Sequence, residues 1–211
     1  MDTLEKIKGL AKKYERIAIA SCLPMILEEA RAAKPKLIVE LGVSREALAN
    51  KVLAFVAEEN GAVLMSCDLY DFSHVCGYTK WHFYQVEARR LAHLFRQLCD
   101  EIRVPPEVDL LFVDCDERYE TTRGILKVWA PHLAGGGAVM LRCTNLQKDL
   151  IYADGRRTNL GWDNERGVIR AAEEEFGIMF DETKPFSGKV NGYEVKHIPW
   201  GAGLTVLRRL K

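Results

Sequence analysis

The stretch LIVELGVSREAL, residues 37–48, runs from a mostly apolar segment through a single glycine into a helix-like segment. The residues before Gly42 are typical of a buried strand, and Ser44 is a residue type that often caps a helix N-terminus. A strand, a glycine turn and a helix in this order are typical of folds that bind nucleotide-like ligands. The stretch therefore predicts such a fold, and the residues around the turn must identify the ligand.

Two patterns alternate along the chain and indicate its fold. Nearly continuous apolar runs, expected to be buried parallel strands, lie at residues 36–41, 62–67, 81–86, 108–113 and 138–143. Helix-like segments lie at residues 44–60, 88–102, 119–130 and 164–176, with one or two more before residue 34. Segments 177–186 and 201–210 resemble two strands, joined by a turn-rich stretch, that could pair antiparallel at the sheet edge. We therefore expect an α/β fold with a Rossmann-like, doubly wound and mostly parallel sheet.

Length and composition limit the classes of protein to consider. The 211 residues suit one domain, with N-terminal helices in residues 1–35 and the core in residues 36–211. The 30 basic and 30 acidic residues balance, and no basic cluster indicates nucleic acid as a partner. Six scattered cysteines lack metal-site spacing, and no apolar run is long enough to span a membrane. We expect a cytoplasmic protein that binds a small molecule, and a homo-oligomer stays an open alternative.

The turn after Gly42 limits the kind of cofactor. A dinucleotide needs bare backbone around its diphosphate, but Arg45 and Glu46 place side chains there, and Glu46 would repel phosphate. A nucleoside cofactor without phosphates needs one close backbone approach, together with carboxylates for its hydroxyls and a cationic centre. The turn therefore argues against NAD or FAD and is compatible with a nucleoside-type cofactor such as S-adenosylmethionine.

Acidic residues follow the second and third strands, at the sheet edge where ligands bind in such folds. Asp68 can accept hydrogen bonds from two ribose hydroxyls, because an ionised carboxylate accepts several. Glu87 could meet an adenine amino group. It also begins a helix, where the helix dipole favours an acidic residue without any ligand, and both interpretations stay open.

The stretch VDLLFVDCDERYETTRGILKVWAPHLAGGGAVML, residues 108–141, closely resembles the core of the class I S-adenosylmethionine-dependent methyltransferases. The similarity is greatest to small-molecule O-methyltransferases of the macrocin and cephalosporin-pathway type. VELGVS at residues 39–44 resembles their first cofactor motif, GVIRAAEEEF at 167–176 their late helix and GAGLTVLRR at 201–209 their final strand. The resemblance implies a seven-strand sheet whose last strand is antiparallel.

The resemblance also implies roles for individual residues. Glu40, Gly42 and Ser44 would lie in the cofactor turn. Asp68 would lie at the ribose, Glu87 near the adenine and Asp114 beside the methionine end of the cofactor. Asp116 would be the general base, because methyl transfer to an alcohol requires removal of the hydroxyl proton. Alternatively, Asp116 only caps the following helix.

Two departures from the family pattern affect the site. The second glycine of the cofactor turn is missing, and the carboxylate pair that binds metal at the fifth strand is replaced by Arg142 and Cys143. Arginine cannot ligate magnesium, so we expect a metal-independent site in which Arg142 faces Asp114 or Asp116 and supplies positive charge.

The sequence therefore predicts transfer of a methyl group from S-adenosylmethionine to a hydroxyl of a small molecule. The alternatives are a catalytically silent binding protein of the same fold and a methyltransferase that acts on carbon or nitrogen. Residues 71–80 and 146–167 form long loops at the ligand edge, which favours a role as binding lids. Arg156, Arg157 and Trp162 are candidate acceptor contacts there.

Overall fold

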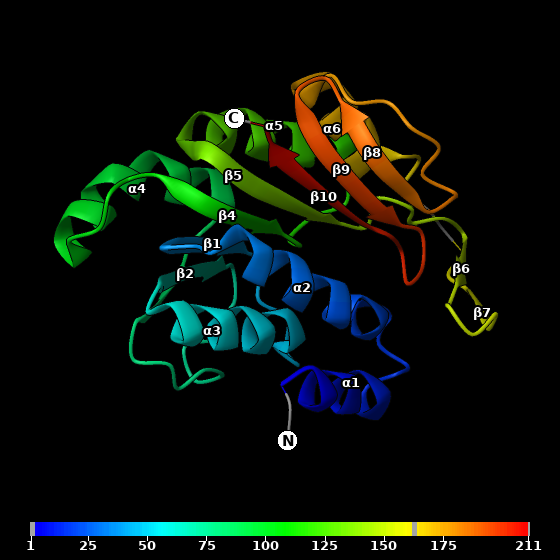
Figure 1. Ribbon diagram of the computed structural model, residues 1–211, viewed down its shortest axis with the longest axis horizontal. Helices are drawn as coiled ribbons and strands as arrows, with labels where there is room; N and C mark the ends of the chain where they lie inside the picture. Colours follow the sequence, from blue (N-terminus) through cyan, green and yellow to red (C-terminus); the bar gives the residue numbers. More distant parts are fainter. Residues whose placement is uncertain (1–2, 162–163, 211) are drawn as a thin grey trace.

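The computed structural model describes residues 3–161 and 164–210, and its centre is an eight-stranded sheet in the order β3-β2-β1-β4-β5-β10-β9-β8 (Figure 1). These strands are β1 Leu37–Leu41, β2 Val63–Asp68, β3 Trp81–Gln85, β4 Val108–Val113, β5 Leu133–Arg142, β8 Phe186–Val190, β9 Tyr193–Ile198 and β10 Leu204–Arg209. The first five are parallel, and the last three are antiparallel to their neighbours. The predicted α/β class with a mostly parallel sheet is confirmed.

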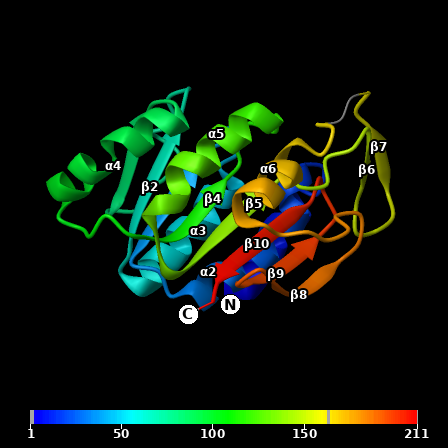
Figure 2. The ribbon, with the colours of Figure 1, turned by 90° about the horizontal axis from the view of Figure 1, so that it is seen from above.

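Helices cover both faces of the sheet, as Figures 1 and 2 show. One face carries α1 Thr3–Lys13, η1 Ala18–Cys22, α2 Leu23–Ala33 and α3 Leu48–Asn60. The other carries α4 Ala88–Ile102, α5 Tyr119–Trp129, η2 Ala130–His132 and α6 Gly167–Phe176. A small hairpin, β6 Asp149–Ile151 with β7 Arg157–Asn159, extends from one end. No helix in the described ranges combines the length and apolar composition that crossing a membrane requires.

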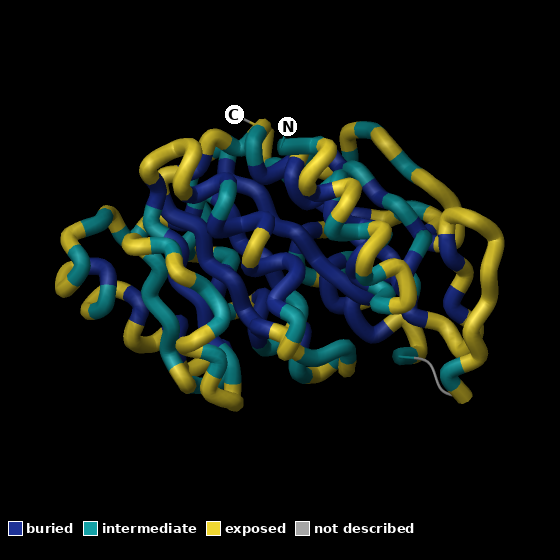
Figure 3. Tube along the Cα trace, turned by 90° about the horizontal axis from the view of Figure 1, so that it is seen from below, coloured by how far each residue is buried: buried dark blue, intermediate teal, exposed yellow. Residues whose placement is uncertain are grey.

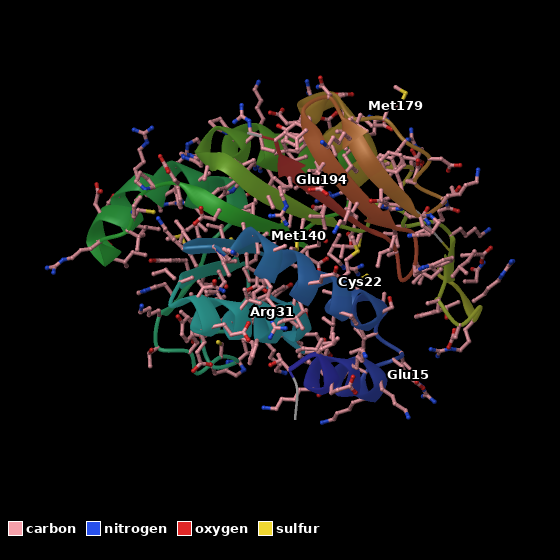
Figure 4. All side chains as sticks on the ribbon, viewed as in Figure 1. Glu15, Cys22, Arg31, Met140, Met179 and Glu194 are labelled. Carbon is pink, nitrogen blue, oxygen red and sulfur yellow. The ribbon has the colours of Figure 1, made fainter. Side chains whose placement is uncertain are left out.

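Alternate side chains of the central strands enter two hydrophobic cores. Val39 of β1 packs with α4, α5 and α6, whereas Ile38 packs with α2 and α3. Met140 of β5 and Cys22 at the end of η1, both labelled in Figure 4, belong to the second core. Figure 3 shows the buried residues running through the middle of the molecule. Burial on both faces explains why these strands are continuous apolar runs in the sequence.

The first helix after the glycine turn starts later than predicted, so the expectation that Ser44 caps it is wrong. α3 begins at Leu48, and its N-cap residue is Ala47, which has a left-handed backbone (φ 49°). Residues 43–47 instead form a turn in which the Ala47 N–H donates to the Ser44 carbonyl over 2.9 Å. A tertiary contact explains the late start of α3, because the Val43 N–H donates to the Asp68 carboxylate of β2 over 2.8 Å. Ser44 is exposed at the edge of this turn.

The C-terminal part of the sheet also differs from the prediction. Most of segment 177–186 is not a strand, and the stretch predicted as turn-rich forms the hairpin of β8 and β9. The hairpin turns at Asn191 and Gly192, whose φ angles are 44° and 80°. An Asn-Gly pair between two strands favours the tight turn that matches strand twist. This pair was the local signal for the hairpin, and it gives the sheet one strand more than the seven expected.

Candidate functional site

A cavity of about 450 Å³ opens at the carboxyl ends of the parallel strands β1, β2, β3 and β4. Four predicted site residues line it, namely Ser44, Asp68, Glu87 and Asp116. Apolar side chains, among them Leu69, Phe72 and Ile125, form much of the rest of its wall, together with Arg89 and Arg118. The structure therefore brings together side chains that lie up to 72 positions apart in the sequence, from Ser44 to Asp116.

The turn after β1 is packed against the end of β4. Gly42 has a positive φ of 96°, and its N–H donates to the Cys67 carbonyl over 2.9 Å. A Cβ atom at this position would collide with the backbone carbonyl of Asp114. Glycine is therefore required here by the contact between two strand ends, whether or not a cofactor also approaches it.

Asp68 connects this turn to the cavity. Its Oδ2 accepts a hydrogen bond from the Val43 N–H at 2.8 Å, and its Oδ1 accepts one from the Tyr70 N–H at 3.0 Å. An ionised carboxylate has about four lone-pair positions, so it can accept two further hydrogen bonds on the cavity side. Asp68 thus holds the turn in place and still offers acceptors to a ligand.

Glu87 combines the two roles considered for it. It is the N-cap of α4, where its carboxylate accepts hydrogen bonds from Arg89 Nε at 2.9 Å and from the Arg90 N–H at 3.3 Å. Burial by itself raises the pKa of Glu87, but these hydrogen bonds outweigh it and hold the pKa below its ordinary value. The side chain also lines the cavity as an ionised group.

Asp116 is held by its neighbour Arg118. The backbone N–H of Arg118 donates to Oδ1 at 2.8 Å, and its guanidinium donates to both carboxylate oxygens, with Nη2 2.6 Å from Oδ2. These contacts lower the pKa of Asp116 below its ordinary value. The N-cap residue of α5 is Arg118 and has no side-chain cap bond, so Asp116 does not cap the helix in the way considered from the sequence.

A second cavity, of about 660 Å³, shares three residues with the first. Cys115, Asp116 and Arg118 line both cavities. Tyr119, Asn164, Glu165 and Arg170 are further residues of the second cavity. The guanidinium of Arg170 lies 3.5 Å from the centre of the Tyr119 ring, in cation–π geometry. Two adjacent cavities with one carboxylate at their boundary suit two ligands that react with each other.

Asp114 and Arg142 line a third, much smaller cavity, whose wall also includes Cys115 and Asp116. Arg142 is 5% exposed, and its Nε is 3.7 Å from Oδ2 of Asp114. Its Nη1 donates to the carbonyls of Gly201 at 2.8 Å and Gly203 at 3.2 Å. Burial raises the pKa of Asp114 to about 6, and Arg142 offsets part of the rise. Arg142 therefore faces Asp114, as expected, but not Asp116, which pairs with Arg118.

Glu40 does not reach either cavity. Its side chain points to the α3 side of the sheet, is 1% exposed, and accepts hydrogen bonds from Asn50 Nδ2 and Ser66 Oγ, both at 2.6 Å. Burial raises the pKa of Glu40 to about 7, against the two hydrogen bonds. In this arrangement its side chain connects β1 to α3 and β2, and a direct cofactor contact stays a prediction.

Sequence reasoning gave no role to several residues that the structure brings to the site. Arg118 is the most important, and an arginine two residues after Asp116 on a turn is the signal that could have identified it. Of the loop residues, Phe72 lines the first cavity, and Asn164 lines the second.

The three candidate acceptor contacts predicted in the loop 146–167 are not found at the two cavities in the described structure. Arg156 pairs with Asp154 in the hairpin, Arg157 lies in β7, and neither lines these two cavities. Trp162 lies outside the described residues. Within residues 3–161 and 164–210, no group of three His, Cys, Asp or Glu side chains is placed to hold a metal ion.

The position of Glu40 generates a prediction about stability. Its pKa of about 7 lies above the ordinary 4.5, so ionisation of the buried carboxyl opposes folding. The free-energy cost of ionising Glu40 is absent below about pH 4.5 and grows as the pH rises from there to about 7. Above about pH 7 it reaches its full value of about 3 kcal/mol. Glu40→Gln keeps an acceptor for Asn50 and Ser66 and removes the charge. We expect the variant to gain stability relative to the wild type at alkaline pH and not at acidic pH. Denaturant unfolding at several pH values measures this, and parallel pH profiles would contradict it.

Comparisons with known proteins identify the fold. No protein-family model matches the sequence, and no curated protein does. Among solved structures, PaMTH1, a methyltransferase from Podospora anserina bound to SAH, is 14% identical, with 100% of this chain and 89% of that chain covered and a TM-score of 0.58. CalS11, a TDP-rhamnose 3'-O-methyltransferase of calicheamicin biosynthesis, is 17% identical, covering 88% and 77%, with a TM-score of 0.52.

The MycE methyltransferase of mycinamycin biosynthesis, in complex with Mg, SAH and mycinamycin VI, is a third similar structure. It is 14% identical, with a TM-score of 0.55, 89% of this chain covered and 49% of that chain. This chain therefore spans about half the length of MycE. At these identities the likeness establishes architecture, and the chain has the Rossmann-like fold that these methyltransferases share.

Proposed function

We propose that the protein transfers a methyl group from S-adenosylmethionine to a hydroxyl group of a small molecule. The observation that carries the proposal is the pair of adjacent cavities with Asp116 on the wall of both. The first cavity suits the cofactor, and the second suits the acceptor. The fold and the ligands of the similar structures, SAH in PaMTH1 and in MycE, support this assignment.

The residues of the first cavity fit an adenosyl cofactor. Its volume of about 450 Å³ lies within the range of roughly 300–1,000 Å³ typical of small-molecule sites. Asp68 keeps two acceptor positions for ribose hydroxyls, and Leu69 and Ile125 provide apolar surface for a base. Glu87 provides a carboxylate for an amino group. The wall carries three carboxylates against two guanidinium groups, Arg89 and Arg118, and this excess of negative charge favours a ligand with a cationic centre over one with a diphosphate.

The bound cofactor would supply an electrophilic methyl group, and the chain's own residues would position the acceptor and remove its proton. Asp116 is the carboxylate at the boundary of the two cavities, so it can reach a hydroxyl in the second cavity that faces the first. Its oxygen would accept the hydroxyl proton as the acceptor attacks. Asn164 and Arg170 would orient the acceptor through hydrogen bonds.

Two finer points belong to the same proposal. The six cysteines are all free in the structure, and four of them are buried, which suits a reducing compartment such as the cytoplasm.

The silent binding protein and the carbon or nitrogen methyltransferase differ from this proposal in their products. Incubation with S-adenosylmethionine and a panel of hydroxylated, amine and carbon acceptors, followed by mass spectrometry, separates the three.

Asp68→Ala should weaken binding of S-adenosylhomocysteine about tenfold to a hundredfold, equivalent to roughly 1.5–3 kcal/mol for hydrogen bonds to a charged group. Isothermal titration calorimetry measures the change. Because Asp68 also holds the Val43 N–H, thermal unfolding of the same variant is needed to separate lost contacts from a disordered turn. A loss of affinity below about twofold in a folded variant would assign Asp68 to the turn alone.

Asp116→Asn should reduce turnover on the order of 100-fold, the usual scale of a general base, and leave cofactor affinity unchanged. Formation of S-adenosylhomocysteine with an active acceptor gives the turnover, and calorimetry gives the affinity. If both fall equally, Asp116 has a structural role and the assignment of the base is wrong.

Activity should be unchanged by EDTA. Arg142 places a buried guanidinium beside Asp114, and this guanidinium would repel a divalent cation at that carboxylate. The turnover assay with EDTA, with EDTA followed by excess magnesium, and with buffer alone measures the effect. Activity that disappears with EDTA and returns with magnesium would show that a metal acts in the reaction.

A further inference from the structure

The proposed base is covered in this structure by an arginine that is itself almost fully solvated. The Asp116 side chain is 20% exposed, whereas that of Arg118 is 82% exposed. Three donors of Arg118, the backbone N–H, Nε and Nη2, are directed at the two carboxylate oxygens. The two carboxylate oxygens that would have to accept the proton of an acceptor hydroxyl are therefore both bonded to this guanidinium.

The guanidinium can leave at low cost. Within the described residues, the only carboxylate that ion-pairs with Arg118 is Asp116, and no packed side chain has to move with it. Because the Arg118 guanidinium is mostly in water, water can replace the contacts that it loses when it moves. Arg118 also lines both cavities, so either a cofactor or an acceptor that enters would contact it.

We propose, on the basis of the proposed function, that Arg118 is a positioning residue that covers Asp116 until an acceptor displaces its guanidinium and places a hydroxyl on the carboxylate. With Arg118 in place, Asp116 keeps its charge, and both of its carboxylate oxygens accept hydrogen bonds from Arg118. After displacement the carboxylate loses its strongest donors, so its affinity for a proton rises when a proton has to be accepted. The guanidinium, turned into the second cavity, can donate to acceptor oxygens there.

Other charged groups face the same carboxylate, and the test must separate their effect from that of Arg118. Those on the walls of the two cavities are Asp68, Glu87, Arg89, Glu117, Glu165 and Arg170. Asp114 and Arg142 lie below it, and Thr121 of α5 also contacts it. None of them is changed by a substitution at Arg118, so a titration difference between variant and wild type reports the guanidinium.

The first experiment is an NMR titration of the Asp116 carboxyl in the wild type, Arg118→Gln and Arg118→Lys, with Arg123→Gln as matched control. Arg123 lies on the same helix and pairs with Glu174 at 3.2 Å. We expect the pKa of Asp116 to move up toward the ordinary aspartate value in Arg118→Gln, partly in Arg118→Lys and not in Arg123→Gln. The backbone N–H bond stays in every variant. An unchanged pKa in Arg118→Gln would overturn the proposal, whether or not the protein is a methyltransferase.

The second experiment uses the acceptor found in the turnover assay. The acid limb of the kcat/KM profile should move to higher pH in Arg118→Gln by the same amount as the Asp116 titration, because this limb reports the base of the free enzyme. An acid limb that stays in place while the Asp116 titration moves would show that Arg118 does not act through the base, and would also overturn the proposal.

Discussion

The contact between Gly42 and the backbone of Asp114 fixes the geometry on which the rest of the site depends. It holds the turn after β1 against the end of β4, and the Asp68 carboxylate holds the same turn from β2. Three strand ends are thereby fixed relative to one another before any ligand is present. Preorganisation of this kind reduces the entropy lost when a ligand binds, so loop residues can form a defined cavity.

Two aspartates at the end of β4 show how strongly local surroundings control charge. Asp114 and Asp116 are separated by one residue, but the pKa of the first is raised to about 6 by burial and that of the second is lowered by its arginine. Each has a different arginine partner, Arg142 from β5 and Arg118 from its own turn. Pairs of titratable groups with opposite shifts are typical of sites that move protons. The chain bends at Cys115, just after β4 ends at Val113, and this separates the surroundings of the two side chains.

The sequence predicted the parts of the structure that depend on local pattern. Apolar runs gave the five parallel strands, and Gly61 marks the end of α3 as expected, with its N–H bonded to carbonyls of the last turn. The start of α3 could not be predicted from Ser44, because a contact with Asp68, 24 positions away, decides it. The Asn191–Gly192 pair was a local signal for the hairpin, but the stretch around it was interpreted as a turn-rich connection.

Prediction of the site was likewise limited to what local sequence pattern determines. The spacing of acids after the strands brought Asp68, Glu87 and Asp116 into one cavity as expected. Glu40 is also an acid at a strand end, but it lies within β1, one residue before the last, and alternation turns it to the opposite face. Whether an acid at a strand end faces the cavity or the opposite side depends on its position relative to the last residue of the strand. An apolar run in the sequence does not show which residue is the last.

The buried Arg142 connects the site to the N-terminal helices. Its guanidinium is enclosed by Cys22, whose sulfur lies 3.6 Å from Nη1, and by carbonyls of the loop 201–203, which itself packs on Ala18. The N-terminal segment is therefore a wall of this charged centre and not an appendage. Removing it by truncation would admit water to a cation that the fold keeps dry, and would expose the apolar side of the sheet at the same time. For engineering, this means that α1, η1 and α2 should be kept together with the sheet face that they cover.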